Sequence, residues 1–483
     1  MKLRELLKNL EILSFNADMD TEILDICYDS RKAAPGSMFV AIKGFESDGH
    51  RFIPKAKELG ASVVLCQDIP EIDIAYVQVA DCRMALAQAS RELFGNPAAE
   101  MTVIGITGTS GKTTSSYLIK HMLESKLNAK VGLIGTNGNL IGDEHIHSEH
   151  TTPESYELHK LFRQMKEAGC SHVVMEVSSH SLTLHRVGGM EFDVALYTNL
   201  SQDHLDFHKD MEDYAAAKQK LFSMCKKACV NADDTWAKFM IEKANCPVIN
   251  FSAESNAAEL TANDLRLSSD GVRFAAVYNN EIAMTKLKIP GHFSVLNALG
   301  VMAVGLSLGL SLADCADAMS SAEGVKGRLE IVPSDGDYSI IIDYSHKPDA
   351  LEKVLKILRP ITRGRLMCLF GCGGDRDKLK RPIMGKISEE LADISIVTSD
   401  NPRTEEPMAI INEITAGMSK KSGVKVICDR EEAIRWAIDN AVSGDVILLA
   451  GKGHEDYQVV GHEKRHMDER EIVAQHLENR KNK

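Results

Sequence analysis

Residues 105–114 read GITGTSGKTT, a pattern typical of loops that bind nucleotide phosphates. Glycines let backbone N–H groups close around phosphate oxygens, and a helix beginning at the lysine adds positive potential. The pattern predicts that Lys112 contacts the β- and γ-phosphates and that the Thr113 hydroxyl holds Mg²⁺. Ile106 stands where the strict motif has its first glycine. The ATP-binding residues predicted in this loop are Gly108, Thr109, Ser110, Gly111, Lys112, Thr113 and Thr114.

Further polar residues follow two apolar runs downstream of this loop. Glu176 lies near the end of the run at 172–177, where a carboxylate at the carboxyl end of a strand is placed to take Mg²⁺. The segment 199–208 follows the next run and is rich in histidine and aspartate. These residue types suit metal and phosphate chemistry, and they equally suit a solvated helix cap.

The phosphate loop requires a strand before it and a helix after it. The apolar run at 102–106 predicts the strand, and residues 113–125 have a helical pattern. Similar runs at 131–134, 172–177 and 193–198 predict more buried strands, with helical segments between several of them. We therefore expect a central P-loop ATPase domain with a parallel sheet, at residues 99–327.

Two further domains are predicted on either side of the central one. Residues 1–98 contain a helical start and apolar runs at 37–42 and 61–66, which indicate a small mixed α/β domain. Residues 328–483 alternate helical patterns with five apolar runs, which predict a Rossmann-like, doubly wound open sheet. These runs are at 339–343, 366–370, 394–397, 424–427 and 446–449. The fold class is accordingly α/β with three domains.

Composition excludes several classes of protein. Of the 483 residues, 44% are apolar and 26% are charged, a balance typical of globular proteins. The net charge of −13 argues against nucleic acid and anionic membranes as partners. No apolar run approaches the roughly 18 residues of a membrane helix, and residues 1–15 lack the apolar core of a secretory signal. The eleven cysteines, an odd number without a C-x-x-C pair, predict reduced thiols and a cytoplasmic location.

Several motifs, in one order along the chain, resemble those of the Mur ligases, the ATP-dependent amide ligases that assemble the peptidoglycan stem peptide. They are DSR at 29–31, TGTSGKTT at 107–114, TTP at 151–153, EVSSH at 176–180, TNLSQDHLDFH at 198–208, AAAKQKLF at 215–222, GHFSVLN at 291–297, KGRLE at 326–330 and DYSHKPDAL at 343–351. Each motif is weak by itself beside the phosphate loop, whereas their joint occurrence in family order is highly specific.

Within the family, the chain resembles the type that adds the third residue to UDP-N-acetylmuramoyl-L-alanyl-D-glutamate. GGDRD at 373–377, DNPR at 400–403 and GKGHE at 451–455 are similar to the pattern of members that add meso-diaminopimelate. Guanidinium groups suit the carboxylates of this amino acid, and Glu455 suits its ammonium. The resemblance implies that Arg403 distinguishes diaminopimelate from lysine. The implied diaminopimelate-binding residues are Arg376, Asp400, Asn401, Pro402, Arg403, Gly451 and Glu455.

The resemblance also implies the other ligands and the chemistry. The D-glutamate γ-carboxylate would attack ATP to give an acyl phosphate and ADP, and the amine would then displace phosphate. Implied catalytic residues are Lys112, Glu176, His204 and Lys218, and implied ligands of two Mg²⁺ ions are Thr113, Glu176, His204 and a Lys218 carbamylated by CO₂. Further implied ATP contacts are Asn297, Arg328 and Asp343, and implied contacts to the UDP-linked dipeptide are Ser30, Thr151, Thr152, Ser178 and Arg186. We expect a monomer.

Some positions depart from the usual forms of the family, and two other functions are compatible with a phosphate loop. Ser294, Ser345 and Lys347 replace residues common in their motifs, and Leu184 replaces a polar substrate contact of some members. One alternative is a folylpolyglutamate-type or cyanophycin-type synthetase, against which the DSR, DNPR and GKGHE motifs argue. The other is a regulatory or transport P-loop ATPase, which would hydrolyse ATP without either acceptor substrate.

Overall fold

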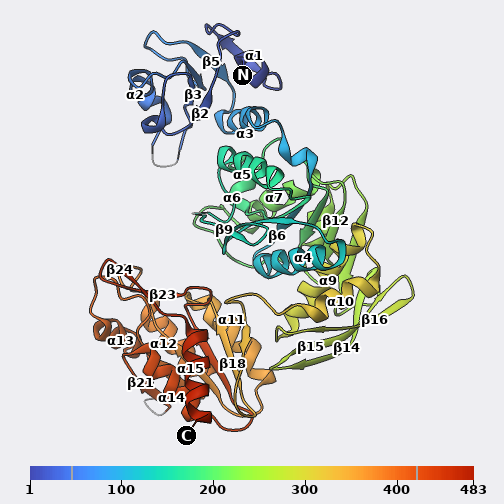
Figure 1. Cartoon of the computed structure of the whole chain (residues 1–483), viewed down its shortest axis with the longest axis vertical. Coiled ribbons are helices and arrows are strands. Elements are labelled where there is room, and N and C mark those ends of the chain that lie inside the picture. The colour runs from blue at the N-terminus through green and yellow to red at the C-terminus, as the bar shows by residue number, and fades with distance from the viewer. Residues whose placement is uncertain (45–46, 149, 420–422, 483) are drawn as a thin grey trace. The chain divides into compact units, whose positions relative to one another are not determined.

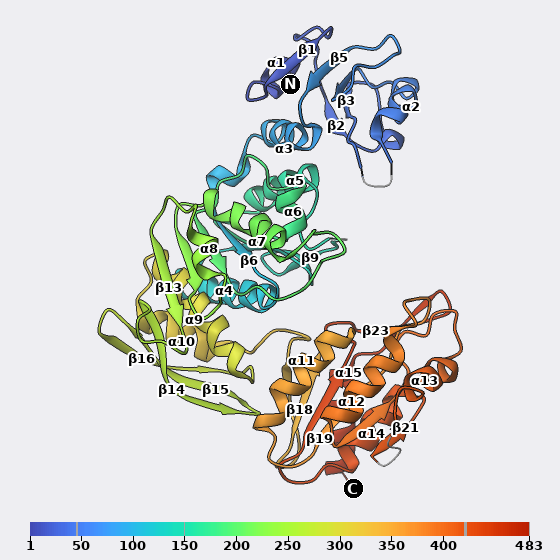
Figure 2. The same cartoon turned by 180° about the vertical axis from the view of Figure 1, so that it is seen from behind.

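The computed structural model describes residues 1–44, 47–148, 150–419 and 423–482. The chain forms two compact units, Met1–Phe251 with Ala303–Leu310, and Ser252–Met302 with Ser311–Lys483 (Figures 1 and 2). Each unit has its own α/β architecture. Among the described residues no helix is both long and apolar enough to cross a membrane.

The first unit begins with a five-stranded sheet in the order β1-β5-β4-β3-β2. The predicted strands at 37–42 and 61–66 are confirmed as β3 and β4, and both are fully buried. Only β1 runs antiparallel to its neighbour among the described pairings of this sheet. The elements are α1 (Leu3–Leu6), β1 (Ile12–Phe15), β2 (Asp25–Cys27), β3 (Ser37–Val40), α2 (Ile53–Glu58), β4 (Val63–Cys66), β5 (Tyr76–Val79) and α3 (Cys82–Leu93).

A larger, mainly parallel sheet forms the rest of the first unit, in the order β13-β12-β11-β6-β10-β7-β8-β9. Its strands β6, β7, β10 and β11 are the predicted buried runs, whereas the buried strand β12 was not predicted. Helix α4 packs against β7 and β10. The elements are β6 (Thr102–Thr107), α4 (Lys112–Leu127), β7 (Val131–Gly135), β8 (Gly138–Ile141), β9 (Glu144–Ile146), α5 (Ser155–Glu167), β10 (His172–Glu176), α6 (Ser179–Thr183), β11 (Val194–Tyr197), α7 (Met211–Gln219), β12 (Ala228–Asn231), α8 (Ala237–Ile241) and β13 (Val248–Ser252).

The register of this sheet determines where the polar segments lie. Ile106 of β6 pairs with Glu176 of β10, and Thr107 pairs with Tyr197 of β11. The three strands therefore end at one edge of the sheet. The phosphate loop, Glu176 and the segment after β11 leave the sheet at that edge, as the sequence predicted.

The second unit starts with an antiparallel meander that the sequence analysis did not predict. Strands β14 (Leu260–Ser268), β15 (Gly271–Tyr278) and β16 (Glu281–Leu287) pair in succession, and α10 packs against β16 and β15. Helix α9 (His292–Ser307) and helix α10 (Leu312–Ser321) follow.

The remainder of the second unit is a six-stranded sheet in the order β17-β18-β22-β19-β20-β21. All five predicted strands are present and parallel, which confirms the open doubly wound sheet. Strand β17, antiparallel at the edge, and the hairpin β23–β24 were not predicted. The elements are β17 (Glu330–Val332), β18 (Ser339–Asp343), α11 (Pro348–Leu358), β19 (Leu366–Phe370), α12 (Lys380–Leu391), β20 (Ile394–Val397), α13 (Pro407–Thr415), β21 (Val424–Val426), α14 (Arg430–Asp439), β22 (Val446–Ala450), β23 (Tyr457–Val460), β24 (Glu463–His466) and α15 (Glu469–Lys481).

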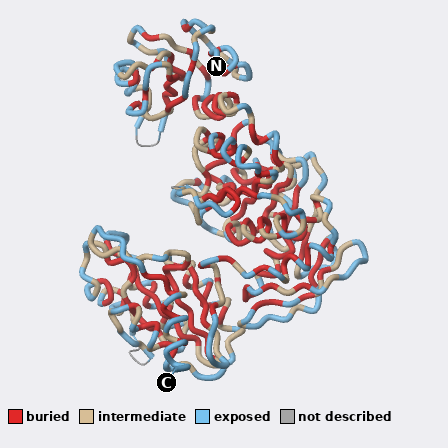
Figure 3. Tube along the Cα trace, viewed as in Figure 1, coloured by how far each residue is buried: buried red, intermediate tan, exposed pale blue. Residues whose placement is uncertain are grey.

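Apolar packing follows the strands in both units, where buried residues concentrate (Figure 3). Helix α11 has one apolar face, on which Leu351, Val354, Leu355 and Leu358 are all buried. The eleven cysteines are all free thiols, as predicted, and most of them are buried. Burial raises the pKa of the Cys66 thiol to about 12, so such cysteines behave as small apolar groups.

Candidate active site

The phosphate loop has a backbone shape that requires glycine. Gly108 has φ of +148°, and a Cβ atom at this position would lie 1.9 Å from the Thr198 hydroxyl oxygen. The loop therefore approaches the segment after β11 too closely for any side chain at Gly108. Helix α4 begins directly after it at Lys112, so its first N–H groups face the predicted phosphates.

Thr198 and Asn199 fasten this loop to the neighbouring strand. The Asn199 carbonyl accepts from the Thr109 N–H at 2.8 Å, and the Asn199 amide donates to the Ser110 carbonyl at 3.1 Å. The Thr198 hydroxyl donates to the same Ser110 carbonyl at 2.7 Å. The first residues of the 198–208 motif thus position the loop, a role that the sequence left open.

Two lysine side chains meet at one carbonyl oxygen of the loop. Lys112 Nζ lies 2.8 Å from the Gly108 oxygen, and Lys218 Nζ, near the end of α7, lies 2.9 Å from it. Lys218 is only 1% exposed. Burial, together with the charge of Lys112, lowers the pKa of Lys218 well below its usual value of 10.5. The amine is therefore far easier to deprotonate than an ordinary lysine.

Glu176 is a buried carboxylate at the carboxyl end of β10. Its oxygens accept from the Thr136 N–H at 3.0 Å and from the Thr136 hydroxyl at 3.1 Å. A side chain on Gly135 would collide with Glu176, which fixes the approach of the two strands. Thr136 was not singled out from the sequence, because it lies outside every recognised motif.

His204 lies in a cluster of rings beside the phosphate loop. Its ring is 4.9 Å from that of His180 and 6.1 Å from that of Tyr214. Burial lowers the pKa of His204 despite the nearby charge of Asp203, and Lys112 and Lys218 lower it further. The imidazole is accordingly neutral at pH 7 and able to bind a metal ion or a proton.

His208, four residues further along the chain, holds this cluster in place through contacts with α6 and α7. Its Nε2 lies 2.9 Å from the Ser179 hydroxyl, and its Nδ1 lies 3.1 Å from a carboxylate oxygen of Asp213 in the first turn of α7. His208 therefore joins the His204 segment to α6 and to the helix that carries Lys218.

A cleft of 630 Å³ in the first unit is lined by the DSR motif. Ser30 lies in it, as predicted for a contact to the UDP-linked substrate, together with Arg83 and Glu154 from other elements. Arg186 donates to Glu154 at 2.9 Å and to the Thr152 carbonyl at 2.9 Å. The Thr152 hydroxyl in turn donates to the Glu176 carbonyl at 2.9 Å.

Thr151 and Ser178 belong to the same hydrogen-bonded set. The Thr151 hydroxyl lies 3.0 Å from that of Thr136, and the Ser178 hydroxyl lies 3.4 Å from that of Thr152. The predicted dipeptide contacts Thr151, Thr152, Ser178 and Arg186 are thus joined through Thr136 and Glu176 to the edge that carries the phosphate loop.

Asp48, His50 and Asp68 are close enough together in the first unit to suggest a metal site. His50, however, already uses both ring nitrogens. Its Nδ1 lies 2.7 Å from Asp48, and its Nε2 accepts from the Gln67 N–H at 2.9 Å. This histidine therefore serves to hold two loops together.

A second cavity of 630 Å³ lies within the second unit and gathers most of the predicted diaminopimelate contacts. Its lining includes Arg376, Asp400, Asn401, Arg403, Gly451 and Glu455. Pro402, the remaining predicted contact, does not line the cavity. Its carbonyl oxygen packs against Gly374, 1.8 Å from where a Cβ atom on that glycine would be. Cationic and anionic groups thus face the same space.

Internal contacts hold the charged groups of this cavity in place. Arg403 donates to the Gly374 carbonyl at 2.9 Å. Lys452 is 0% exposed and donates to Glu455 at 2.9 Å and to Asn401 at 3.0 Å. Burial alone would raise the pKa of Asp400, but the charges of Lys452 and Arg430 outweigh burial, so this pKa is lower than usual.

Lys452 was not predicted from the sequence to be a functional residue, although it lies inside the GKGHE motif. Its neighbours Gly451 and Glu455 match the family's known contact positions, whereas a buried structural cation has no signature of its own. Arg381 was missed for the same reason: it is 0% exposed and donates to Glu405 at 2.9 Å and to the Gly373 carbonyl at 3.1 Å.

The remaining predicted ATP contacts lie in the second unit, so the phosphate loop and these residues are in separately described parts of the chain. Asn297 is 5% exposed, and its amide nitrogen has no hydrogen-bond partner among the described residues. Such a buried donor suits a ligand. Asp343 is buried and accepts from the Leu329 and Ser345 N–H groups, both at 2.9 Å.

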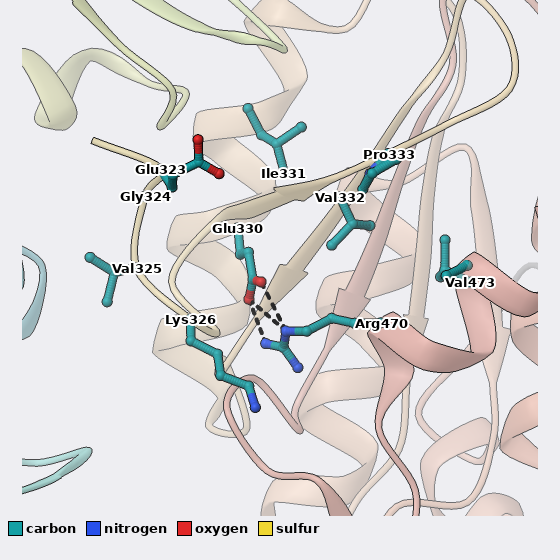
Figure 4. A pocket seen from close by; sticks show the side chains of 11 residues that line it. Glu323, Gly324, Val325, Lys326, Glu330, Ile331, Val332, Pro333, Arg470 and Val473 are labelled. Atoms are coloured by element: carbon teal, nitrogen blue, oxygen red, sulfur yellow. Dashed lines mark hydrogen bonds and ion pairs between the residues drawn. The ribbon is translucent and has the colours of Figure 1, made fainter. Parts of the chain in front are cut away.

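Arg470 fixes the KGRLE segment that carries Arg328. Its Nε donates to Glu330 at 2.8 Å, and its guanidinium also donates to the Gly453 carbonyl at 2.8 Å. Figure 4 shows the Glu330–Arg470 pair at a cavity of 440 Å³ beside Lys326 and Val473. The pair ties this segment to the GKGHE loop.

The lowered pKa of Lys218 predicts a pH-dependent stability. Between the lowered pKa and 10.5, the unfolded chain binds a proton at this lysine that the folded chain does not, so stability rises with pH in that window. In buffer free of CO₂, Lys218→Met should therefore raise the Tm at pH 7, and the difference should narrow towards pH 10. Thermal unfolding followed by circular dichroism measures this, and a lower Tm at pH 7 would contradict the burial argument.

Comparison with known proteins places this geometry in a family. Residues 22–95, 106–305 and 327–453 match the models described as Mur ligase family, catalytic domain; Mur ligase middle domain; and Mur ligase, glutamate ligase domain. The chain is 45% identical to the UDP-N-acetylmuramoyl-L-alanyl-D-glutamate–2,6-diaminopimelate ligase of Clostridium botulinum, over 98% of this chain and 99% of that protein.

Solved structures agree with this comparison. A structure of a UDP-N-acetylmuramoyl-L-alanyl-D-glutamate–2,6-diaminopimelate ligase has a TM-score of 0.76 and 30% identity, and covers 100% of this chain and 99% of its own. A folylpolyglutamate synthase of Mycobacterium tuberculosis, with a TM-score of 0.59 and 17% identity over 76% of this chain and 92% of its own, shares the fold alone. The family models together span three successive α/β domains, which confirms the predicted architecture, while the borders at 98/99 and 327/328 stay predictions. The chain belongs to the Mur ligase family.

Proposed function

We propose that this enzyme joins meso-diaminopimelate to the γ-carboxylate of UDP-N-acetylmuramoyl-L-alanyl-D-glutamate, with conversion of ATP to ADP and phosphate. The observation that carries the proposal is the cavity of the second unit, which presents Arg376 and Arg403 beside Asp400 and Glu455. A diamino dicarboxylate needs both signs of charge, whereas lysine has no second carboxylate for a guanidinium to bind. Relatives that bear this activity in their names match the chain over nearly its whole length.

The reaction begins with phosphoryl transfer to the γ-carboxylate, which gives an acyl phosphate. Repulsion between this carboxylate and the triphosphate must be offset by cations, and Lys112 is the cation proposed for this role, which its contact with the Gly108 carbonyl of the phosphate loop supports. Thr113 and Glu176 offer the oxygen ligands that Mg²⁺ prefers, and with His204 they are the residues proposed to hold it. Bound there, Mg²⁺ would supply further charge compensation for the phosphates.

The other substrate contacts follow the two units. Ser30, Thr151, Thr152, Ser178 and Arg186 are proposed to hold the UDP-linked dipeptide, since Ser30 lines the first unit's cleft and the others form one hydrogen-bonded set. Asn297, Arg328 and Asp343 are proposed to complete the ATP site. We also propose a cytoplasmic location, which the need for ATP and a UDP-linked precursor supports.

Carbamylation of Lys218 is proposed for a chemical reason. Only a neutral amine attacks CO₂, forming a new N–C bond with release of one proton, and the lowered pKa of Lys218 favours the neutral amine. The product is an anion, which would attract the charge of Lys112 and would offer oxygen ligands to Mg²⁺.

A regulatory or transport ATPase is the main alternative of another class. Such a protein would release ADP without either acceptor, and it would have no use for the charged cavity of the second unit. The folylpolyglutamate-type and cyanophycin-type synthetases are disfavoured by the extent of the match to diaminopimelate ligases.

Steady-state release of ADP tests the proposed reaction. We expect release to require both the UDP-linked dipeptide and meso-diaminopimelate, and Lys112→Ala to lower it by about 10²-fold or more. Release that continues unchanged without the acceptors would favour the regulatory ATPase.

The carbamate is tested with ¹³C-bicarbonate and NMR. We expect a carbamate carbon signal in the enzyme that is lost in Lys218→Arg and retained in Lys220→Arg, the control two residues away. Loss of ligation in Lys218→Arg should accompany loss of the signal. If no carbamate signal forms in active enzyme, the carbamate proposal is wrong.

The amino-acid specificity is tested at Arg403. Arg403→Ala should raise the KM for diaminopimelate about 10- to 100-fold, as expected for loss of charged hydrogen bonds, and leave the KM for the UDP-linked dipeptide unchanged. Arg363→Ala, an exposed arginine paired with Asp337, is the matched control and should change neither. Equal use of lysine by the unmodified enzyme would refute the assigned specificity.

A further inference from the structure

His346 lies in the loop between β18 and α11 and lines the cavity proposed to hold the amino acid. The loop is firmly held: the Ser345 N–H donates to Asp343 at 2.9 Å, and Lys380 donates to the His346 carbonyl at 2.8 Å. Of the described residues that line this cavity, His346 alone carries an imidazole.

The hydrogen bonds of His346 determine its tautomer. Its Nδ1 lies 2.9 Å from the Tyr344 carbonyl oxygen, which can only accept, so Nδ1 carries a proton. No described residue forms a hydrogen bond with Nε2. In the neutral ring, Nε2 therefore keeps a free lone pair in the amino-acid cavity.

The surroundings keep this ring neutral at pH 7. Burial lowers the pKa of His346, and the charges of Lys380 on α12 and Lys347 on its own loop lower it further. The Tyr344 carbonyl and the carboxylate of Asp400 act in the opposite direction but do not reverse the shift. His346 is thus a base without a proton on Nε2.

Two acidic groups of the cavity, Asp400 and Glu455, are less suited to accept a proton, and Asp349 and Asp377 also line it. Asp400 has a lowered pKa, and Glu455 accepts hydrogen bonds from Lys452 at 2.9 Å and from Asn401 at 3.0 Å. The cavity also contains the hydrogen-bond donors Lys347, Lys380, Arg376 and Arg403. These groups fit the binding of charges, whereas Nε2 fits proton transfer.

An amino acid arrives at neutral pH as an ammonium ion, which has no lone pair with which to attack a carbonyl. We propose that His346 is the general base of this ligase, and that its Nε2 takes a proton from the attacking ammonium of the amino acid. The proposal rests on the proposed function and adds a catalytic residue to it.

The step balances as follows. The N–H bond breaks and the proton passes to Nε2; the nitrogen lone pair then forms the C–N bond to the acyl phosphate carbonyl. The C–O bond to phosphate breaks, phosphate leaves with that electron pair, and it takes the second proton of the nitrogen as hydrogen phosphate. His346 finally releases its proton to solvent.

His346→Asn provides the test, because the Asn amide can still donate to the Tyr344 carbonyl while the equivalent of Nε2 is removed. We expect kcat for ligation at pH 7.5 to fall by about 10²-fold or more, with little change in the KM for diaminopimelate. The loss should shrink as pH rises, because the amine then deprotonates without help. His454→Asn is the control, since His454 also packs on the Tyr344 ring, at 4.8 Å, but does not line the cavity.

Hydroxylamine separates this role from the first half of the reaction. It is an uncharged nucleophile at neutral pH and needs no base, so it should trap the acyl phosphate as a hydroxamate at the parent rate in His346→Asn. Hydroxamate formation that falls as far as ligation, or ligation within about threefold of the parent, would overturn the proposal for His346. If the parent enzyme forms no hydroxamate, the proposed function itself fails, and His346 with it.

Discussion

One carbonyl oxygen organises the catalytic edge of the first unit: the Gly108 oxygen accepts from both Lys112 and Lys218. Two ammonium groups this close repel each other strongly where solvent is excluded. Of the two, the buried Lys218 is the one whose pKa falls well below its usual value. Three features bring the two lysines to the same carbonyl oxygen. They are the glycine loop, the hydrogen bond from the Thr109 N–H to Asn199, and the register of β6 with β11.

In the second unit, groups of both charges line one cavity, and contacts within the protein hold these groups in position. Internal cations hold the acidic groups: Lys452 fixes Glu455, and Arg381 fixes Glu405 and the loop at Gly373. Burying such pairs stabilises little by itself, but losing one partner would leave an unpaired charge in the interior. The protein has a net charge of −13, but cationic side chains lie where its proposed polyanionic ligands bind.

The features that could be predicted from the sequence are those that short-range patterns determine. The buried runs, the glycine loop and the motif order were enough for the parallel sheets, and six of the seven predicted diaminopimelate contacts line one cavity of the second unit. The burial of Lys218 could not be predicted from periodicity, because it depends on α7 packing against the phosphate loop. Thr136, Lys452 and the Nδ1 tautomer of His346 depend likewise on contacts between distant segments. The β14–β16 meander was missed, because β14 and β16 are largely exposed and lack continuous apolar runs, although β15 has one at residues 274–278.

The central claim is that folding places a neutral amine beside Lys112. NMR titration of lysines labelled with ¹³C at Cε, in buffer free of CO₂ and with Lys218→Arg to assign the signal, measures this directly. We expect the Lys218 signal to titrate at a pH well below that of the other lysines. A Lys218 signal that titrates with the other lysines near 10.5 would contradict it.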